Sequence, residues 1–178
     1  MPESPASPRA ALYEQVVTTF GAAIVRLARA YEREDDRRQD LLQDIHLALW
    51  RSLDSYDGRC SLRTWVYRVA HNVATSHVLR DRRRGVHTLV SLDALEARSY
   101  AVDGEHLAYQ RVQQGWLHEM LGQLKPLDRQ LMLLYLEGMD ATCIGEVSGL
   151  SPGNVATKIH RIKRILTDRA RHGEHNAE

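Results

Sequence analysis

Cysteine is scarce in this chain of 178 residues, which contains only Cys60 and Cys143. A small secreted domain that depends on disulfides needs more cysteines, so we expect two reduced, structural thiols. Long apolar runs are also missing: the longest, Leu131–Leu136, has six residues, against roughly 20 for a membrane span. The first eight residues contain no basic stretch followed by an apolar segment, so no secretory signal is expected. The sequence therefore predicts a cytoplasmic protein without membrane insertion.

The net charge is close to zero, at +1, but the charges are distributed unevenly. Residues 59–84 contain seven basic and one acidic side chain, and residues 151–178 contain six and three. The segments before them are acidic, with seven basic against ten acidic side chains in 1–58 and four against nine in 85–150. Two basic clusters indicate a polyanionic partner such as nucleic acid. A solvated helix face would give the same pattern and stays an alternative.

Alternating β-branched residues are almost absent, whereas apolar residues recur every three or four positions, so the sequence predicts an all-α fold. A first small helical bundle is expected over residues 10–84. Residues 85–105 show no periodicity and predict a flexible linker. A second helical domain is expected over residues 106–170. The helices are predicted over residues 12–32, 38–53, 62–80, 107–124 and 127–136, with a short one after Asp140 and a longer one from Pro152.

The end of the second domain has the pattern of a helix-turn-helix, in which Gly145 allows close approach and Gly149 suits a turn with positive φ. On the longer helix, a projection at 100° per residue separates the apolar side chains from polar and cationic ones. A helix that lies in the major groove of DNA needs such a polar face. The pattern therefore favours DNA binding, with a purely structural helix pair as the alternative. The polar face consists of Asn154, Thr157, His160, Arg161 and Arg164.

The third predicted helix of the first domain combines a polar side with aromatic neighbours and a basic end. Its polar side is predicted to contain Thr64, Arg68, His71, Asn72 and Thr75, flanked by Trp65 and Tyr67 and followed by Arg80, Arg82, Arg83 and Arg84. Aromatic rings stack on unpaired bases while cations follow the phosphate backbone, so this segment suits single-stranded nucleic acid. Trp65 and Tyr67 would serve equally well as core residues of a small bundle.

The order of these motifs resembles a bacterial RNA polymerase sigma factor of the extracytoplasmic-function (ECF) group over about residues 10–170. The run Asp40-Leu41-Leu42-Gln43-Asp44-Ile45 with Leu49-Trp50-Arg51 resembles the sigma region 2 helix that docks on the polymerase clamp. The run Ser61-Leu62-Arg63-Thr64-Trp65 through Asn72 is similar to the stretch that opens and reads the −10 element. Residues 127–164 resemble region 4, whose helix-turn-helix reads the −35 element.

The resemblance implies a binding protein and not an enzyme: it would attach to core RNA polymerase, direct it to promoter DNA, melt the −10 element and read the −35 element. No metal or other cofactor is expected, and an anti-sigma protein is a candidate partner, because members of this group are commonly held by one. The implied core-polymerase contacts are Asp40, Leu41, Gln43, Asp44 and Trp50. The implied −10 contacts are Tyr56, Arg63, Trp65, Arg68, His71, Asn72, Arg80, Arg82 and Arg83. The implied −35 contacts are Asn154, Thr157, Lys158, His160, Arg161 and Arg164.

The chain departs from the family pattern just before Asp40, where Arg37, Arg38 and Gln39 stand in place of the usual acids. This departure predicts weaker docking, which a modification or a partner that adds negative charge would restore. Ala156 and Lys158 likewise replace a more basic pair, which predicts fewer −35 contacts.

Two other classes of protein fit some of these features. A two-domain repressor or activator also needs a helix-turn-helix, but it does not explain the run from Arg63 to Asn72. A metal-dependent enzyme would have to use the nine histidines and two cysteines. However, His71 and His77 fall on different sides of their helix, and the sequence contains no pair of histidines four residues apart.

Overall fold

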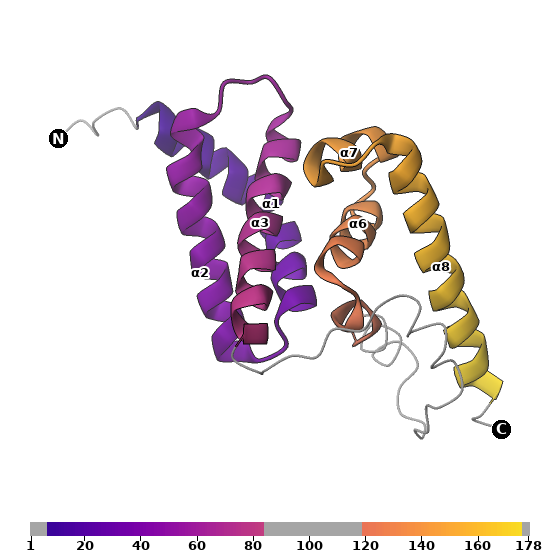
Figure 1. Cartoon of the computed structure of the whole chain (residues 1–178). Helices are drawn as coiled ribbons and strands as arrows, with labels where there is room; N and C mark the ends of the chain where they lie inside the picture. The colour runs from indigo at the N-terminus through magenta and orange to yellow at the C-terminus, as the bar shows by residue number, and fades with distance from the viewer. Residues whose placement is uncertain (1–6, 84–118, 176–178) are drawn as a thin grey trace. The chain divides into compact units, whose positions relative to one another are not determined.

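The computed structural model describes residues 7–83 and 119–175 and divides the chain into two compact units, Met1–Arg84 and Gly85–Glu178 (Figure 1). Within the two described ranges every regular element is helical and no strand occurs. The predicted all-α fold with two helical units is therefore confirmed. The linker predicted over residues 85–105 lies outside the described residues. So does most of the helix expected over 107–124, of which residues 119–123 are described and are helical.

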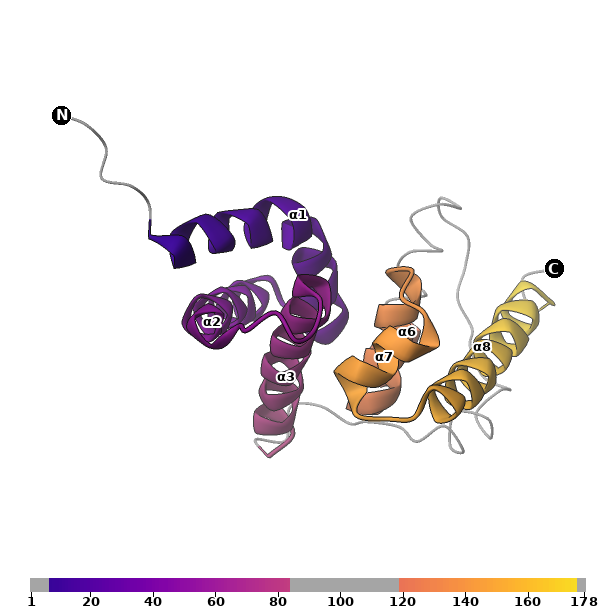
Figure 2. The same cartoon turned by 90° about the horizontal axis from the view of Figure 1, so that it is seen from above.

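The first unit consists of three long helices and one short turn of 3-10 helix: α1 (Pro8–Tyr31), α2 (Asp35–Ser52), η1 (Leu53–Ser55) and α3 (Leu62–Arg83). All three long helices pack on one another, and the view from above separates them (Figure 2). α1 begins four residues earlier than predicted because the Ser7 side chain accepts a hydrogen bond from the Ala10 amide at 3.2 Å and Pro8 occupies the first turn.

The core of the first unit is a stripe of aliphatic side chains from each helix. Leu41, Ile45 and Leu49 of α2 have no exposed surface, as the helical spacing predicts. Each such leucine or isoleucine stabilises the fold by about 2 kcal/mol on burial. α3 contributes smaller side chains, and α1 supplies the remaining large ones. These residues are Val66, Ala70, Ala74 and Val78 on α3 and Val16, Ile24 and Leu27 on α1.

The second unit contains α6 (Pro126–Leu136), α7 (Ala141–Ser148) and α8 (Pro152–His175), which pack on one another (Figure 1). Its main buried cluster joins the helical residues 119–123 to α6 and α8. The members are Met120, Leu121, Leu124, Met132, Ile162, Ile165 and Leu166. The long amphipathic α8 is thus held along its apolar side, which leaves its polar side available.

A buried arginine closes the end of the helix that precedes α6. Arg129 is 2% exposed, and its guanidinium donates hydrogen bonds to the carbonyl oxygens of Leu121 (2.9 Å), Gly122 and Leu124 (3.2 Å). Carbonyls at a helix C-terminus lack partners within the helix, so a cation that caps them is favourable. The sequence pattern did not indicate this contact, because Arg129 stands between Asp128 and Gln130, as an exposed polar residue would, and the spacing gives no sign of its partners.

The turn of the helix-turn-helix has the conformation that its glycines predict. The Asp140 carboxylate accepts a hydrogen bond from the Cys143 amide at 2.8 Å, which caps α7. Gly149 ends α7 with φ of +78°, a conformation that favours glycine. Gly145 makes room chiefly for the turn, because a Cβ atom there would lie 2.7 Å from the Leu150 carbonyl oxygen, and it also lets the start of α8 approach, since Pro152 N would lie 3.8 Å away.

Gly145→Ala should therefore destabilise the second unit by about 1–3 kcal/mol, because the new methyl group meets rigid backbone. Gly153→Ala is the matched control, since a Cβ atom at Gly153 meets nothing within 4 Å. Urea unfolding of both variants measures the difference. Equal losses of stability would show that the contact at Gly145 imposes no constraint.

Candidate nucleic-acid interface

The polar face of α8 is largely exposed over residues 154–164. Asn154, Thr157, His160 and Arg164 are all exposed, and Arg161 is half-buried. The Thr157 hydroxyl donates to the Gly153 carbonyl oxygen at 2.9 Å, so it keeps lone pairs that can accept a further hydrogen bond. This face therefore offers donors, acceptors and cationic groups side by side, as base edges and phosphates require.

Lys158 lies at the edge of this face and points toward α6. Its ammonium nitrogen is 3.3 Å from a carboxylate oxygen of Asp128, whose side chain is only 7% exposed. A buried carboxylate needs a partner of opposite charge, so Lys158 has a structural task in the free protein.

On α3, the predicted −10 residues divide into exposed and enclosed groups. Asn72 and Arg80 are exposed, whereas Arg63 and Arg68 are half-buried. The Arg63 guanidinium lies 5.8 Å from the centre of the Tyr67 ring, a cation–π contact. The side chains of Arg82 and Arg83 lie outside what the structure describes.

The prediction that His71 lies on the exposed polar face is wrong. His71 is 1% exposed, its Nδ1 is 3.0 Å from the Tyr31 hydroxyl, and its ring stacks on that of Tyr67. Burial lowers the pKa of His71 to about 3, so the ring is neutral. Thr64, expected on the same face, is also buried. The projection failed because α3 packs on both α1 and α2, which covers more of its circumference than a single stripe.

The loop before α3 is held by two aromatic rings, Tyr56 and Trp65, both half-buried. Their ring centres are 5.5 Å apart and the planes are tilted by 60°. The Tyr56 hydroxyl donates to the Cys60 carbonyl oxygen at 2.9 Å, and the Trp65 indole nitrogen donates to the Ser52 hydroxyl at 3.2 Å. Tyr56 and Trp65 thus fix the loop against the end of α2, and both side chains keep part of their surface exposed to solvent.

The residues of α2 that were predicted to contact polymerase fall into an exposed group and a group that is buried or half-buried. Asp40, Gln43 and Asp44 are exposed. Leu41 has no exposed surface, so it belongs to the core and not to a contact surface, which corrects its predicted role. Trp50 is half-buried against α1, where its ring lies 5.2 Å from Tyr13 and 4.4 Å from the Arg9 guanidinium.

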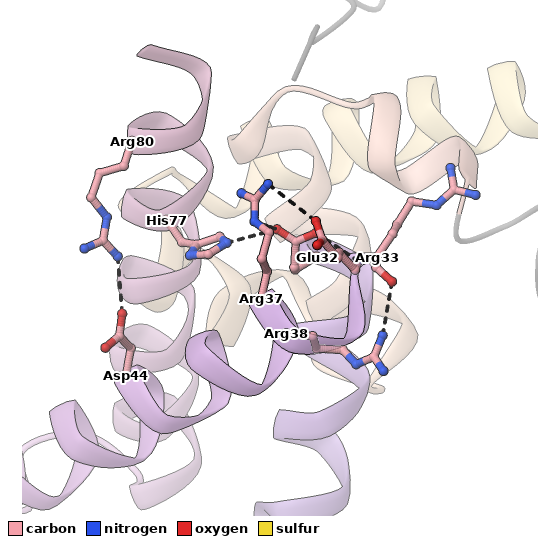
Figure 3. A network of polar contacts seen from close by, with 8 residues as sticks. Glu32, Arg33, Arg37, Arg38, Asp44, His77 and Arg80 are labelled. Carbon is pink, nitrogen blue, oxygen red and sulfur yellow. Dashed lines mark hydrogen bonds and ion pairs between the residues drawn. The ribbon is translucent and has the colours of Figure 1, made fainter. Parts of the chain in front are cut away.

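The two arginines that replace the expected acids are neutralised locally. Arg37 pairs with Glu32 at 3.3 Å and with Glu34 at 3.9 Å, and Arg38 pairs with Asp35 at 2.6 Å. Figure 3 shows Arg37 turned toward Glu32 and away from Asp44. The exposed acids farther along α2 are therefore not opposed by these cations, which the sequence alone did not reveal.

A shallow hollow of about 420 Å³ separates the exposed sides of α2 and α3. Asp44 of α2 and Arg80 of α3 form an ion pair of 3.3 Å at its rim (Figure 3). The structure thus brings together one residue predicted to bind polymerase and one predicted to bind DNA. The hollow is lined by Asp44, Leu47, Ala48, Arg51, Asn72, Val73, Ser76 and Arg80.

Comparison with known families settles the class of protein. Residues 16–84 match Sigma-70 region 2, and residues 114–166 match Sigma-70, region 4, so the two matches cover more than half of the chain. The chain belongs to the sigma-70 family. Proteins of this family are transcription initiation factors that direct RNA polymerase to promoters. Among the described residues of this sigma-70 protein, no group of three potential metal ligands occurs, and no helix has the length and apolar content of a membrane span.

Curated relatives of this sigma-70 protein are similar to it over most of its length. The ECF RNA polymerase sigma-E factor of Escherichia coli (strain K12) is 24% identical over 139 residues, which are 73% of this chain and 72% of that protein. The RNA polymerase sigma factor NccH of Alcaligenes xylosoxydans xylosoxydans is 24% identical over 159 residues, 87% of this chain and 84% of its own.

Two solved structures share the fold. CnrH, solved in complex with the cytosolic domain of CnrY, has a TM-score of 0.62 at 21% identity and covers 87% of this chain and 84% of its own. The sigma factor RpoE of Bartonella quintana, solved with the anti-sigma factor NepR, has a TM-score of 0.64 at 17% identity and covers 89% and 96%.

The ion pair between Lys158 and Asp128 leads to a stability prediction. Lys158→Ala should lower the free energy of unfolding by about 1–3 kcal/mol, because it leaves a buried carboxylate without its partner. Lys163→Ala is the control, since the Lys163 ammonium donates to the Tyr135 hydroxyl at 3.0 Å on the exposed surface. Thermal unfolding compares the two variants, and equal losses would contradict a structural task for Lys158.

The buried histidine leads to a prediction on pH. Because the pKa of His71 is about 3 in the folded chain and 6.5 in the unfolded chain, the unfolded state binds a proton first as pH falls. Stability due to neutral His71 is present above pH 6.5 and is lost progressively below it, by up to about 1.4 kcal/mol per pH unit. Urea unfolding between about pH 4.5 and pH 6.5 should show a smaller slope for His71→Leu. Identical slopes would contradict the neutral, buried state.

Proposed function

We propose that the chain is an ECF sigma factor in which each helical unit reads one promoter element while α2 binds core RNA polymerase. The observation that carries this proposal is the pair of polar helix faces, on α3 and on α8, in a chain that matches both sigma regions. Catalysis of RNA synthesis remains with the polymerase, and the chain acts in the cytoplasm together with it.

The exposed side of α2 supplies the docking surface through Asp40, Gln43 and Asp44. The exposed carboxylate of Asp40, which Arg37 and Arg38 leave uncovered, attracts a basic partner surface and accelerates its association. Asp44 exchanges its 3.3 Å ion pair with Arg80 for a contact with the polymerase in this proposal. Trp50 stabilises this surface by fixing the C-terminal part of α2, since its ring packs against Tyr13 of α1.

In the first unit, Asn72 and Arg80 contact the opened −10 strand, with Arg63, Arg68, Arg82 and Arg83 along the backbone. The Tyr56–Trp65 pair offers an aromatic surface for a base that has left the stack. His71 contacts no DNA in this proposal, because it is buried.

In the second unit, the exposed side of α8 enters the major groove at the −35 element. Asn154, Thr157 and His160 read base edges, while Arg161 and Arg164 bind phosphates or guanine. Lys158 makes no direct contact, because Asp128 holds its ammonium group.

We infer that residues 85–105 act as a tether between a domain of residues 10–84 and one of residues 106–170. A tether raises the effective concentration of the second reader once the first is bound, so each contact can be weak alone. An anti-sigma protein is inferred as a further partner, since both structural relatives above were solved in complexes, one of them with a named anti-sigma factor.

Replacing the two arginines of α8 tests the second reader. Arg161→Ala with Arg164→Ala should reduce occupancy of the −35 element by about 10- to 100-fold, because each lost contact costs about 1 kcal/mol or more. Footprinting with the assembled polymerase measures this occupancy. Arg26→Ala with Arg29→Ala removes the same charge from α1 and should leave it unchanged. Loss of polymerase docking in the α8 variant would contradict the assignment.

Reversing one charge on α2 tests the docking surface. Asp40→Arg should weaken binding to core polymerase at least tenfold, because it places a cation against a basic partner. Glu14→Arg, on the exposed side of α1, is a charge-matched control outside the proposed surface. Titration of core polymerase with fluorescently labelled chain measures both, and unchanged affinity of the Asp40 variant would refute this surface.

A further inference from the structure

We propose that Tyr31 and Glu32 are positioning residues for the −10 contacts. Tyr31 acts through His71 and Glu32 through His77, and together they fix the rotation of α3 about its axis and its position along that axis. This inference rests on the proposed function, because it concerns the helix that carries Asn72 and Arg80. Neither Tyr31 nor Glu32 is exposed to DNA or polymerase, since they are 4% and 2% exposed.

Two adjacent residues at the end of α1 hold two buried histidines of α3. The Tyr31 hydroxyl lies 3.0 Å from His71 Nδ1, and a Glu32 carboxylate oxygen lies 3.1 Å from His77 Nε2. Figure 3 shows His77 reaching from α3 toward Glu32 at the turn between α1 and α2. Both histidines are buried, at 1% and 9% exposure.

The packing of α3 explains why such directional contacts are needed. The middle of its buried stripe consists of Ala70 and Ala74, both without exposed surface, with Val66 and Val78 on either side. Small side chains interlock less deeply than large ones, so beyond the buried ring of Tyr67 nearer the start of the helix, apolar packing defines the rotation and sliding of α3 weakly. Hydrogen bonds to buried polar groups define one setting, because any other setting leaves these groups unpaired.

The Glu32 carboxylate is equipped for this task. Burial raises its pKa, but hydrogen bonds from the Glu34 amide and His77, together with the charge of Arg37, outweigh this effect and leave the pKa below its ordinary value. The Glu34 amide donates to it at 3.1 Å, and the Arg37 guanidinium lies at 3.3 Å. The carboxylate is therefore ionised and is fixed from α2 as well as from α3.

The His71 ring depends strongly on Tyr31. Within the part of the chain that the structure describes, His71 Nε2 has no hydrogen-bond partner. Removal of the Tyr31 hydroxyl would leave both ring nitrogens of a buried histidine unpaired, which favours a shift of α3 that brings them to water or to another group.

The anchored histidines stand directly beside the proposed DNA contacts. Asn72 follows His71 in sequence, and Arg80 is three residues after His77, on the next turn of the helix. Binding side chains must be held to within about 0.5 Å of their productive geometry. A small rotation or slide of α3 would therefore displace Asn72 and Arg80 together while the bundle stays folded.

The test uses the full chain with Tyr31→Phe and Glu32→Met, which remove the anchoring oxygen atoms and keep the approximate size of the side chains. Tyr13→Phe is a matched control: the Tyr13 hydroxyl is also 3.0 Å from a histidine, His46 Nδ1, but this bond joins α1 to α2. Hydrogen exchange over residues 68–80 is measured at a temperature where all variants are folded. The same variants, with core polymerase, are assayed for open-complex formation on a promoter that the wild-type chain opens.

We expect exchange over residues 68–80 to rise about tenfold in both anchor variants, as for one buried hydrogen bond lost. Open-complex formation per bound polymerase should fall by a similar factor, and neither quantity should change in Tyr13→Phe. His77→Gln keeps a side-chain N–H donor and should retain more open-complex formation than His77→Leu.

Unchanged exchange in the anchor variants would overturn the inference. It would also be overturned if exchange rose while open-complex formation matched that of Tyr13→Phe, because the anchors would then be structural only. A wild-type chain that opens no promoter with polymerase would instead overturn the proposed function, and this inference with it. The wild-type arm therefore separates the two failures.

Discussion

The packing of α3 against both α1 and α2 is the constraint on which the first unit depends. One helix has to contribute a core face and also present polar groups outward. The conflict is resolved with small apolar residues, Ala70 and Ala74, and with two histidines that are buried and hydrogen-bonded. Asn72 and Arg80 are left exposed on the remaining arc of the helix.

The second unit solves a similar problem with buried charges. Arg129 caps the carbonyls of the preceding helix, and Lys158 neutralises Asp128 beneath α8. Each pair joins two segments of a small bundle in which apolar burial alone is limited. The basic side chains of α8 therefore serve two purposes. Lys158 stabilises the unit, whereas others such as Arg164 are exposed to solvent.

The sequence was sufficient for the helices that the structure describes, because helical spacing and cap residues are local signals, and the order of the motifs was sufficient for the class of protein. Asp140, Gly149 and Pro152 mark the ends of α7 and α8 where the structure has them. The site could be predicted less fully. His71 was expected outside and Leu41 at a contact surface, yet both are buried, because burial depends on how many neighbours enclose a helix. The partners of Arg37 and Lys158 depend on tertiary contacts, which no spacing rule encodes.

The central claim is that these two helical units act on a promoter while mounted on polymerase. The most direct measurement is in vitro transcription by purified core polymerase, with and without the chain. The templates are DNA fragments from the genome of the organism that encodes the chain. We expect new transcripts that depend on the chain and start downstream of two short shared sequence elements. Absence of any chain-dependent transcript, with the polymerase active alongside another sigma factor, would contradict it.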